Sequence, residues 1–259
     1  MGLKSLQAAA ASTGATWTWA WQMNAFSSHT PAHDFQAADA AVAVTPDTTG
    51  GAVTWTPHLA NAKTTVCDLD VATGLRITPT TATNWHGTKT APSVWAAISN
   101  LIPGVARTDT VCLQVNMSSS PDVTANYDMF GLGITASAAF DTENFATNHR
   151  AYINAKVEIT KQNTTEYTTA TATQHDFREI ILYPGGGMTL NSGVWTGAFP
   201  EPNAITTWQK VLAPEQTKSV TQARFDATDA YIHFFSAKNA SVTAITSTVV
   251  AFRAGTLDA

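Results

Sequence analysis

The chain has 259 residues, of which only 13% are charged, and its formal net charge at pH 7 is −5. No run of Lys or Arg occurs, and phosphate binding needs a basic face, so the composition argues against nucleic acid as a partner. No stretch of about 18 apolar residues occurs either, which argues against a membrane-spanning helix and against a membrane partner.

The first residues predict a short helical or extended arm. Residues 3–11 are rich in Ala, the best helix former, and Gly14 ends the helical pattern. We assign residues 1–14 to an attachment arm, because a terminal segment stays ordered only when it docks on a surface. Leu3 and Leu6 are its candidate attachment contacts.

Three tryptophans follow the arm at alternating positions. Trp17, Trp19 and Trp21 are separated by single Thr or Ala residues, which predicts a strand with all three indoles on one face. Three indoles on one face bury a large area, so we interpret them as a core or subunit-interface stripe that helps to attach the chain. The alternative interpretation is an aromatic platform for sugar rings.

Two short patterns resemble metal-binding motifs, but neither has the residues that a metal site would need. His29 and His33 are four residues apart, but Pro31 lies between them, so a helix that would align them is not expected. Asp68 and Asp70 resemble the start of a calcium loop, but a Pro occupies the position of its closing Glu. The sequence therefore predicts no metal site and no cofactor.

Alternating apolar and polar residues predict a series of short strands after the tryptophans. Two pairs of such strands flank turns that contain Gly: residues 41–45 with 53–56, and residues 65–70 with 75–78. Cys67 and Cys112 both lie in predicted strands. In a chain of this size we interpret them as buried free thiols rather than a disulfide.

The most regular alternation lies near the centre of the chain. Residues 111–117 place Val, Leu, Val and Met on one face, and residues 127–135 place Phe, Leu and Ile on one face. A turn signal rich in Ser at residues 118–122 separates them, which predicts an antiparallel hairpin in the middle of a sandwich. Gly131 and Gly133 lie on the other face of the second strand, where a neighbouring layer is expected to approach closely.

A resemblance to a known superfamily is visible in residues 74–98, GLRITPTTATNWHGTKTAPSVWAAI. A strand ends there in a polar loop, Trp and Thr follow, and Ala-Pro then leads into a hydrophobic run and a long strand. This pattern resembles the first half of the concanavalin A-like jelly rolls, a superfamily of lectins and glucanases. The resemblance covers residues 74–253. The low charge and the Ala-rich arm also resemble accessory virion proteins of tailed bacteriophages.

Later segments fit the same pattern. Four of them alternate or end in turns as strands do: residues 152–159, 178–183, 221–241 and 247–253. The second of these ends in a Pro and three Gly, and the last would close the sandwich. Residues 206–212 fit a helical turn or a strand equally well.

The sequence lacks the pattern that catalysis on such a fold would need. A glucanase requires two carboxylates on one strand face, and the family pattern Glu-x-Asp-x-Glu is absent. We interpret the acidic pairs as solvated surface: Asp141 with Glu143, Asp176 with Glu179, and Asp226 with Asp229. No GxSxG nucleophile motif and no GxxxxGK phosphate loop occurs, so we expect no enzymatic activity and no catalytic residues.

Trp85, His86 and Trp195 are the candidate ligand-binding residues. They lie in predicted loops, where binding residues concentrate. Trp offers a flat apolar face to a sugar ring, and His supplies hydrogen bonds. The alternative is that each Trp closes one end of the sandwich.

These features together predict an all-β fold, a two-sheet antiparallel jelly-roll sandwich over residues 15–259 with the arm at residues 1–14. The expected function is that of a non-enzymatic structural or accessory protein of a bacteriophage virion, in capsid decoration or in a tail or fibre. The virion, assembled in the host cytoplasm, is the expected location. Expected partners are major capsid or tail proteins, surface glycans and further copies of the chain, with a trimer as one arrangement.

Two alternatives remain for the function. The first is a carbohydrate-binding adhesion module that recognises host or environmental glycans. The second is a glycoside hydrolase or lyase, which two carboxyl groups about 5–9 Å apart in a cleft would support.

Overall fold

The computed structural model describes residues 16–28, 33–34, 41–58, 66–70, 74–78, 93–120, 129–136, 150–154, 158–159, 167–168, 175–205, 207–212, 227–228, 230–237 and 246–258. The predicted arm, with Leu3 and Leu6, lies outside these residues, as do Trp85 and His86. Regular structure in the described part is almost all β-strand. None of the helices found there is long and apolar enough to cross a membrane.

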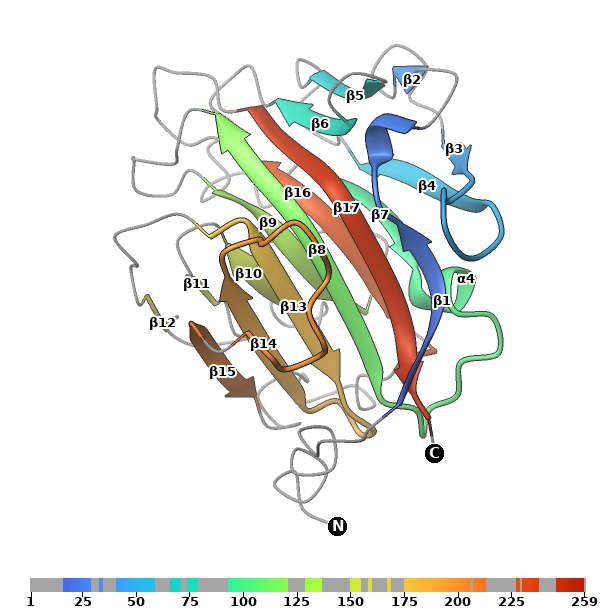
Figure 1. The fold of residues 1–259 in the computed structure, drawn as a ribbon, viewed down its shortest axis with the longest axis vertical. Coiled ribbons are helices and arrows are strands. Elements are labelled where there is room, and N and C mark those ends of the chain that lie inside the picture. The colour runs from blue at the N-terminus through green and yellow to red at the C-terminus, as the bar shows by residue number, and fades with distance from the viewer. Residues whose placement is uncertain are drawn as a thin grey trace.

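The larger of two sheets contains nine strands among the described residues. Their order is β15-β14-β13-β8-β17-β6-β5-β2, and β1 also pairs with β17 (Figure 1). The bounds are β1 (Trp17–Met23), β2 (His33–Asp34), β5 (Val66–Asp70), β6 (Gly74–Thr78), β8 (Val111–Ser120), β13 (Phe177–Leu182), β14 (Met188–Gly193), β15 (Trp208–Leu212) and β17 (Thr246–Leu257).

The smaller sheet contains six strands among the described residues, in the order β10-β9-β16-β7-β4-β3. The bounds are β3 (Val42–Val44), β4 (Val53–His58), β7 (Ser93–Ala97), β9 (Met129–Thr135), β10 (Arg150–Asn154) and β16 (Tyr231–Ala237). The remaining elements are the short helices η1 (Phe26–Ser28) and α4 (Ile98–Leu101) and the strand pair β11 (Glu158–Ile159) and β12 (Tyr167–Thr168).

The predicted all-β, two-sheet antiparallel sandwich is confirmed. Every pair of neighbouring strands in the described part is antiparallel. Successive strands also cross between layers, since β7 lies in the smaller sheet, β8 in the larger and β9 in the smaller again. This crossing gives the sandwich the connectivity of a jelly roll.

The predicted central hairpin is wrong. β8 pairs with β13 and β17 in the larger sheet, while β9 pairs with β10 and β16 in the smaller one. β8 also continues through the predicted turn as far as Ser120, which pairs with Thr246 of β17. Alternation identifies the buried face of a strand but not its neighbour, because every strand that borders the core has such a face.

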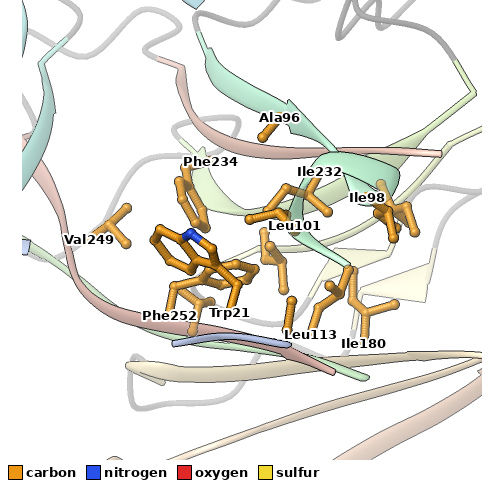
Figure 2. Close-up of a cluster of buried hydrophobic side chains, with 14 of the residues drawn as sticks. Trp21, Ala96, Ile98, Leu101, Leu113, Ile180, Ile232, Phe234, Val249 and Phe252 are labelled. Atoms are coloured by element: carbon orange, nitrogen blue, oxygen red, sulfur yellow. The ribbon is translucent and has the colours of Figure 1, made fainter. Parts of the chain in front are cut away.

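The core between the sheets contains a cluster of five aromatic side chains, called here the inner cluster: Trp21, Phe26, Trp55, Phe234 and Phe252. None of the five is more than 1% exposed. Neighbouring ring centroids lie 5.0–6.2 Å apart. Figure 2 shows Trp21, Phe234 and Phe252 packed together, with aliphatic side chains from both sheets around them.

The predicted face of the three tryptophans is also wrong, because β1 contains a bulge. Trp19 pairs with Gly255 and Trp21 pairs with Ala254, so Ala20 has no partner in β17. An extra residue reverses the alternation of side chains along a strand. Trp21 therefore enters the inner cluster, whereas Trp17 and Trp19 pack on the outer face of the larger sheet against Cys112, Ile181 and Tyr183.

Several further predictions are confirmed. β3 pairs with β4 and β5 pairs with β6, as the turn signals indicated. β13 ends in a tight turn in which the backbone N–H of Tyr183 donates to the carbonyl of Gly187 at 2.8 Å. Residues 208–212, for which the sequence favoured neither a helical turn nor a strand, form a strand. Cys112 is a buried free thiol, and the side chain of Cys67 lies outside the described part.

Candidate functional site

A segment between β14 and β15 covers part of the outer face of the larger sheet. Figure 1 shows this cover segment, residues 194–205, in orange in front of β13. At its start, the backbone N–H of Trp195 donates to Asp176 Oδ1 at 2.6 Å. At its end, Ile205 packs on Gly193 so closely that a Cβ at Gly193 would collide with it. The start of the segment is therefore attached to the residue before β13, and its end is attached to β14.

A buried carboxylate lies beneath the cover segment. Glu179 of β13 is only 1% exposed, and donors surround both of its oxygens. Its Oε1 accepts from Asn191 Nδ2 at 2.6 Å and from the backbone N–H of Asn203 at 3.0 Å. Its Oε2 accepts from Gln114 Nε2 at 2.5 Å and from Cys112 Sγ at 3.7 Å. We call this set of groups, together with Arg253, the polar network.

This burial corrects the interpretation of Glu179 as solvated surface. The outer face of a sheet is solvated only where nothing lies on it, and here the cover segment excludes water. Burial raises the pKa of Glu179 above its ordinary value, while the hydrogen bonds from Gln114, Asn191 and Asn203 act in the opposite direction. The carboxylate thus connects two strands of the sheet to the cover segment.

Arg253 of β17 extends the polar network. Its Nε donates to Gln114 Oε1 at 2.7 Å, and its Nη2 donates to the carbonyl of Pro200 at 2.6 Å. Gln114 Nε2 also donates to that carbonyl, at 3.1 Å. Burial lowers the pKa of Arg253 to about 10, so the guanidinium is still protonated at neutral pH. Arg253 and Gln114 therefore hold the middle of the cover segment against the sheet.

Two aromatic rings contact the Arg253 guanidinium. Its Cζ is 3.6 Å from the ring centroid of Trp19 and 4.8 Å from that of Phe199 in the cover segment. Both distances are within the range of cation–π contacts. A Cβ at Gly255 would collide with the carbonyl of Thr18 and crowd the Trp19 ring. Gly at this position is therefore what allows Trp19 to lie close to the sheet.

These contacts continue into a row of side chains across the outer face. Trp17 stacks beside Trp19 with ring centroids 6.2 Å apart. At the other end, Trp195 lies 5.0 Å from Phe199 and 6.2 Å from Phe177 between centroids. We call the set of six the aromatic row: Phe177, Trp195, Phe199, Arg253, Trp19 and Trp17. Trp17, Trp19, Trp195 and Phe199 are each partly exposed.

The structure brings together some of the predicted site residues and separates others. Trp195, predicted as a ligand contact, and Trp17 and Trp19, predicted as interface residues, lie in one row on one face. Trp21, predicted as part of the same stripe, is in the core instead. Four other predicted site residues are not among the described ones, so they are not placed relative to this row: Trp85, His86, Leu3 and Leu6.

Sequence reasoning missed the groups that hold the row in place. Gln114, Glu179 and Arg253 occupy polar positions of alternating strands, a pattern that is usually a solvated face. The available signal was weak. Residues 112–116 (CLQVN) place Gln114 between apolar side chains, and residues 251–255 (AFRAG) do the same with Arg253. Only the pairing of β13 and β17 with β8 shows that these three side chains meet.

The buried carboxylate is satisfied within the protein, whereas the indoles of the row above it remain partly exposed. Glu179 accepts from three nitrogen donors and a thiol, so its lone pairs already have partners in the protein. Within the described residues, no group of three or more His, Cys, Asp or Glu side chains is placed to hold a metal ion. The partly exposed indoles of the row instead offer apolar faces of the kind that ligand sites use.

No protein-family model matches this sequence, and no curated protein matches it. Among solved structures, a family 7 alginate lyase, A1-II′, in complex with substrate shows a TM-score of 0.40 and 11% identity, over 84% of this chain and 82% of that one. The CBM2 module of the evolved Dit of Lactobacillus casei BL23 phage J-1 shows a TM-score of 0.32 and 10% identity, over 71% of this chain and 78% of that one. Similarities this remote carry no conclusion about what this chain binds or does.

Proposed function

We propose that the protein is a non-enzymatic glycan-binding adhesion protein that uses the aromatic row as its binding surface. The observation that supports this proposal is the row itself, in which partly exposed indoles lie side by side on one face. Sugar rings have apolar faces that stack on such side chains, and their hydroxyl groups find acceptors among neighbouring polar groups.

The polar network supports binding by holding the row in one arrangement. Trp195 and Phe199 belong to the cover segment, whose carbonyl at Pro200 and N–H at Asn203 are both bound to the polar network. A platform that is already ordered loses less conformational entropy when a ligand arrives. The network thus has a structural explanation that needs no catalytic role for Glu179.

The setting that we propose is a bacteriophage particle, where the protein would serve as an accessory or adhesion component. The support for this setting is the low charge and the Ala-rich segment before β1. Deletion of residues 1–14 should abolish incorporation into the particle while circular dichroism of the remaining domain is unchanged. Unchanged incorporation, measured by mass spectrometry of purified particles, would count against the attachment role.

Binding is tested on an array of polysaccharides and oligosaccharides, followed by calorimetry with any glycan that binds. Trp195→Ala and Trp17→Ala should each weaken binding about tenfold or more, since a stacked aromatic is typically a dominant contact. Trp95→Ala is the matched control. Trp95 is also partly exposed and also contacts another ring, Tyr231, at 5.3 Å, but it belongs to the smaller sheet. Equal losses in all three variants would contradict the assignment of the site.

A further inference from the structure

We infer that the aromatic row takes acidic glycans, and that Nη1 of Arg253 is the subsite for the acidic group of the sugar. The ligand class is an oligosaccharide or polysaccharide whose rings carry carboxylate or sulfate groups. This inference rests on the proposed function and names the class of ligand for the same surface. It follows from the donors of Arg253 that the protein leaves without a partner, and from the neutral partners that the protein gives to its other donors.

One edge of the Arg253 guanidinium is used within the protein, and another is open. Nε donates to Gln114 Oε1, and Nη2 donates to the carbonyl of Pro200. Nη1 donates to no group in the described part of the chain, and it is not one of the buried nitrogens there that lack a partner. A ligand can therefore reach the two N–H groups of Nη1, although the residue as a whole is only 8% exposed.

The charge of Arg253 meets only neutral groups in its direct contacts with described residues. These contacts are an amide oxygen, a backbone carbonyl and two aromatic rings. The carboxylate of Glu179 is separated from Arg253 by Gln114, which donates to the first and accepts from the second. Buried charges are usually paired with an opposite charge. The guanidinium is thus fixed in place while its charge is left for an incoming anion.

The buried arginine of the neighbouring strand has no such open edge. Arg178 of β13 points to the core, where its Cζ is 4.6 Å from the Phe130 ring centroid. Its Nη1 and Nη2 donate to the carbonyls of Met117 and His175, both at 2.8 Å, and its Nε is buried. Arg178 therefore stabilises the interior of the sandwich, and Arg253 is the arginine that serves the aromatic row.

Two carboxyl groups lie near Arg253 without contacting it. Buried Glu179 and exposed Glu201 act to raise the pKa of Arg253, but burial has the larger effect and lowers that pKa to about 10. The guanidinium is therefore charged at neutral pH. Water and salt screen Glu201, whereas a ligand anion at Nη1 would form a charge-assisted hydrogen bond in direct contact. Glu201 should weaken the binding of an acidic sugar but not prevent it.

The rings beside Arg253 offer the stacking surface that the same sugar needs. The Cζ of Arg253 is 3.6 Å from the ring centroid of Trp19 and 4.8 Å from that of Phe199, and both rings are partly exposed. A sugar that stacks on either ring brings its exocyclic groups close to the guanidinium. A neutral sugar gains the stacking contact alone, whereas an acidic sugar adds a hydrogen bond to a charged donor, the kind of contact that Arg forms best with a carboxylate.

The test compares matched pairs of oligosaccharides of equal length on the full chain, by calorimetry at about 0.02 M and about 0.5 M salt. One pair is a uronate chain and the methyl ester of the same chain, and the other is a sulfated hexose chain and its unsulfated form. The acidic member of at least one pair should bind about tenfold more tightly than its neutral partner at low salt, with a smaller ratio at high salt. The pair that shows this preference identifies the acidic group.

Variants locate the preference at Arg253. Arg253→Gln should bring the ratio of acidic to neutral binding close to one. Arg76→Gln is the matched control and should leave the ratio unchanged. Arg76 is a partly exposed arginine of the same sheet, but it pairs with Thr248, five residues before Arg253 in β17. Glu201→Gln, at an exposed position, should strengthen acidic binding about twofold to threefold and leave neutral binding nearly unchanged.

Equal affinity within both pairs, or a preference that Arg253→Gln does not reduce, would overturn this inference and leave the proposed function standing. Failure of all four chains to bind would overturn the proposed function, and this inference with it. Circular dichroism and thermal unfolding check that each variant is folded. If Arg253→Gln does not fold, Glu201→Gln decides, since an acidic preference that it leaves unchanged would place the acidic group away from Arg253.

Discussion

Two aromatic clusters lie among the described residues, and one strand contributes to both. β1 places Trp21 in the inner cluster and Trp17 and Trp19 in the aromatic row, because of the bulge at Ala20. The inner cluster is buried among aliphatic side chains of the core. The aromatic row rests on a charged and amide-rich layer and is partly open to solvent.

The difference shows that a tryptophan has two distinct uses on the same sheet. In the inner cluster the whole ring is removed from water, which contributes to the stability of the fold. In the aromatic row part of each indole remains accessible, and polar contacts beneath the ring keep it in place. Substitutions should therefore affect folding strongly in the first cluster, and binding more than folding in the second.

The largest expected effect is in the inner cluster. Trp55→Ala should lower the free energy of unfolding by about 3–5 kcal/mol, because it leaves a large cavity beside Phe234, whose ring stacks on Trp55 at 5.0 Å. Chemical denaturation measures the change. Trp55→Phe is the control, and it should cost only about 1–2 kcal/mol, since the buried Trp55 Nε1 has no hydrogen-bond partner to lose. A loss below about 1 kcal/mol for Trp55→Ala would show that the two clusters do not differ as described.

The next effect concerns the support of the aromatic row. Glu179→Leu removes the acceptor for Gln114 Nε2, Asn191 Nδ2 and the N–H of Asn203, and should cost about 2–3 kcal/mol. The cover segment should also become sensitive to limited proteolysis between residues 194 and 205, because it loses one of its attachments. Glu179→Gln, which keeps one acceptor but adds an NH₂ group among donors, should have a smaller effect. A stable Glu179→Leu variant with a protected cover segment would contradict the role given to the polar network.

A smaller effect is expected from a change beneath Trp19. Gly255→Ala should cost about 1–2 kcal/mol and weaken glycan binding, because the added methyl collides with the carbonyl of Thr18 and displaces Trp19. Gly51→Ala is the matched control, since a Cβ there meets nothing within 4 Å. Denaturation and binding assays on both variants separate an effect of the aromatic row from a general effect of replacing Gly. Equal behaviour of the two variants would remove the support for a close contact at Gly255.

The smallest effect is a pH dependence at His175, two residues before β13. Burial and, to a smaller extent, Arg178 lower the pKa of His175, whose Nδ1 contacts Ser192 Oγ at 2.7 Å. The unfolded chain takes up the proton first, so this contribution to stability is complete above about pH 6.5 and is lost as pH falls toward the lower folded pKa. We expect a loss of up to about 1 kcal/mol between pH 7.5 and 5.5, which His175→Gln should remove.

Glu179 contributes to the pH dependence of stability with the opposite sign. Its pKa is raised in the folded state, so the folded protein binds a proton more readily than the unfolded chain does. Stability from this group therefore increases as pH falls from the folded pKa toward about 4.5. The His175→Gln variant lacks the contribution of His175, so its remaining pH dependence reports the contribution of Glu179. A wild-type stability that does not change between pH 7.5 and 5.5, with the same result for His175→Gln, would contradict the assignment to His175.

Much of the strand content was predictable, because alternation records which side chains face the core. β8 and β9 were each recognised with the correct apolar face, since Leu113, Val115, Phe130 and Leu132 are all in the core. Their pairing was not predictable, since an apolar face carries no information about which strand lies beside it. The bulge at Ala20 was not predictable either, because it depends on the fit of β1 against β17.

For the candidate site, the sequence alone determined the residue types: tryptophans at alternating positions, a Trp in a loop, and few charges on the surrounding strands. Only the tertiary structure decided that Trp195 and Trp19 belong to one row and that Glu179 is buried. The physical reason is that local periodicity acts over a few residues, whereas the aromatic row joins β1, β13, β17 and the cover segment, which are far apart in the chain. Contacts of that kind exist only after the sheet has formed and the cover segment has closed over it.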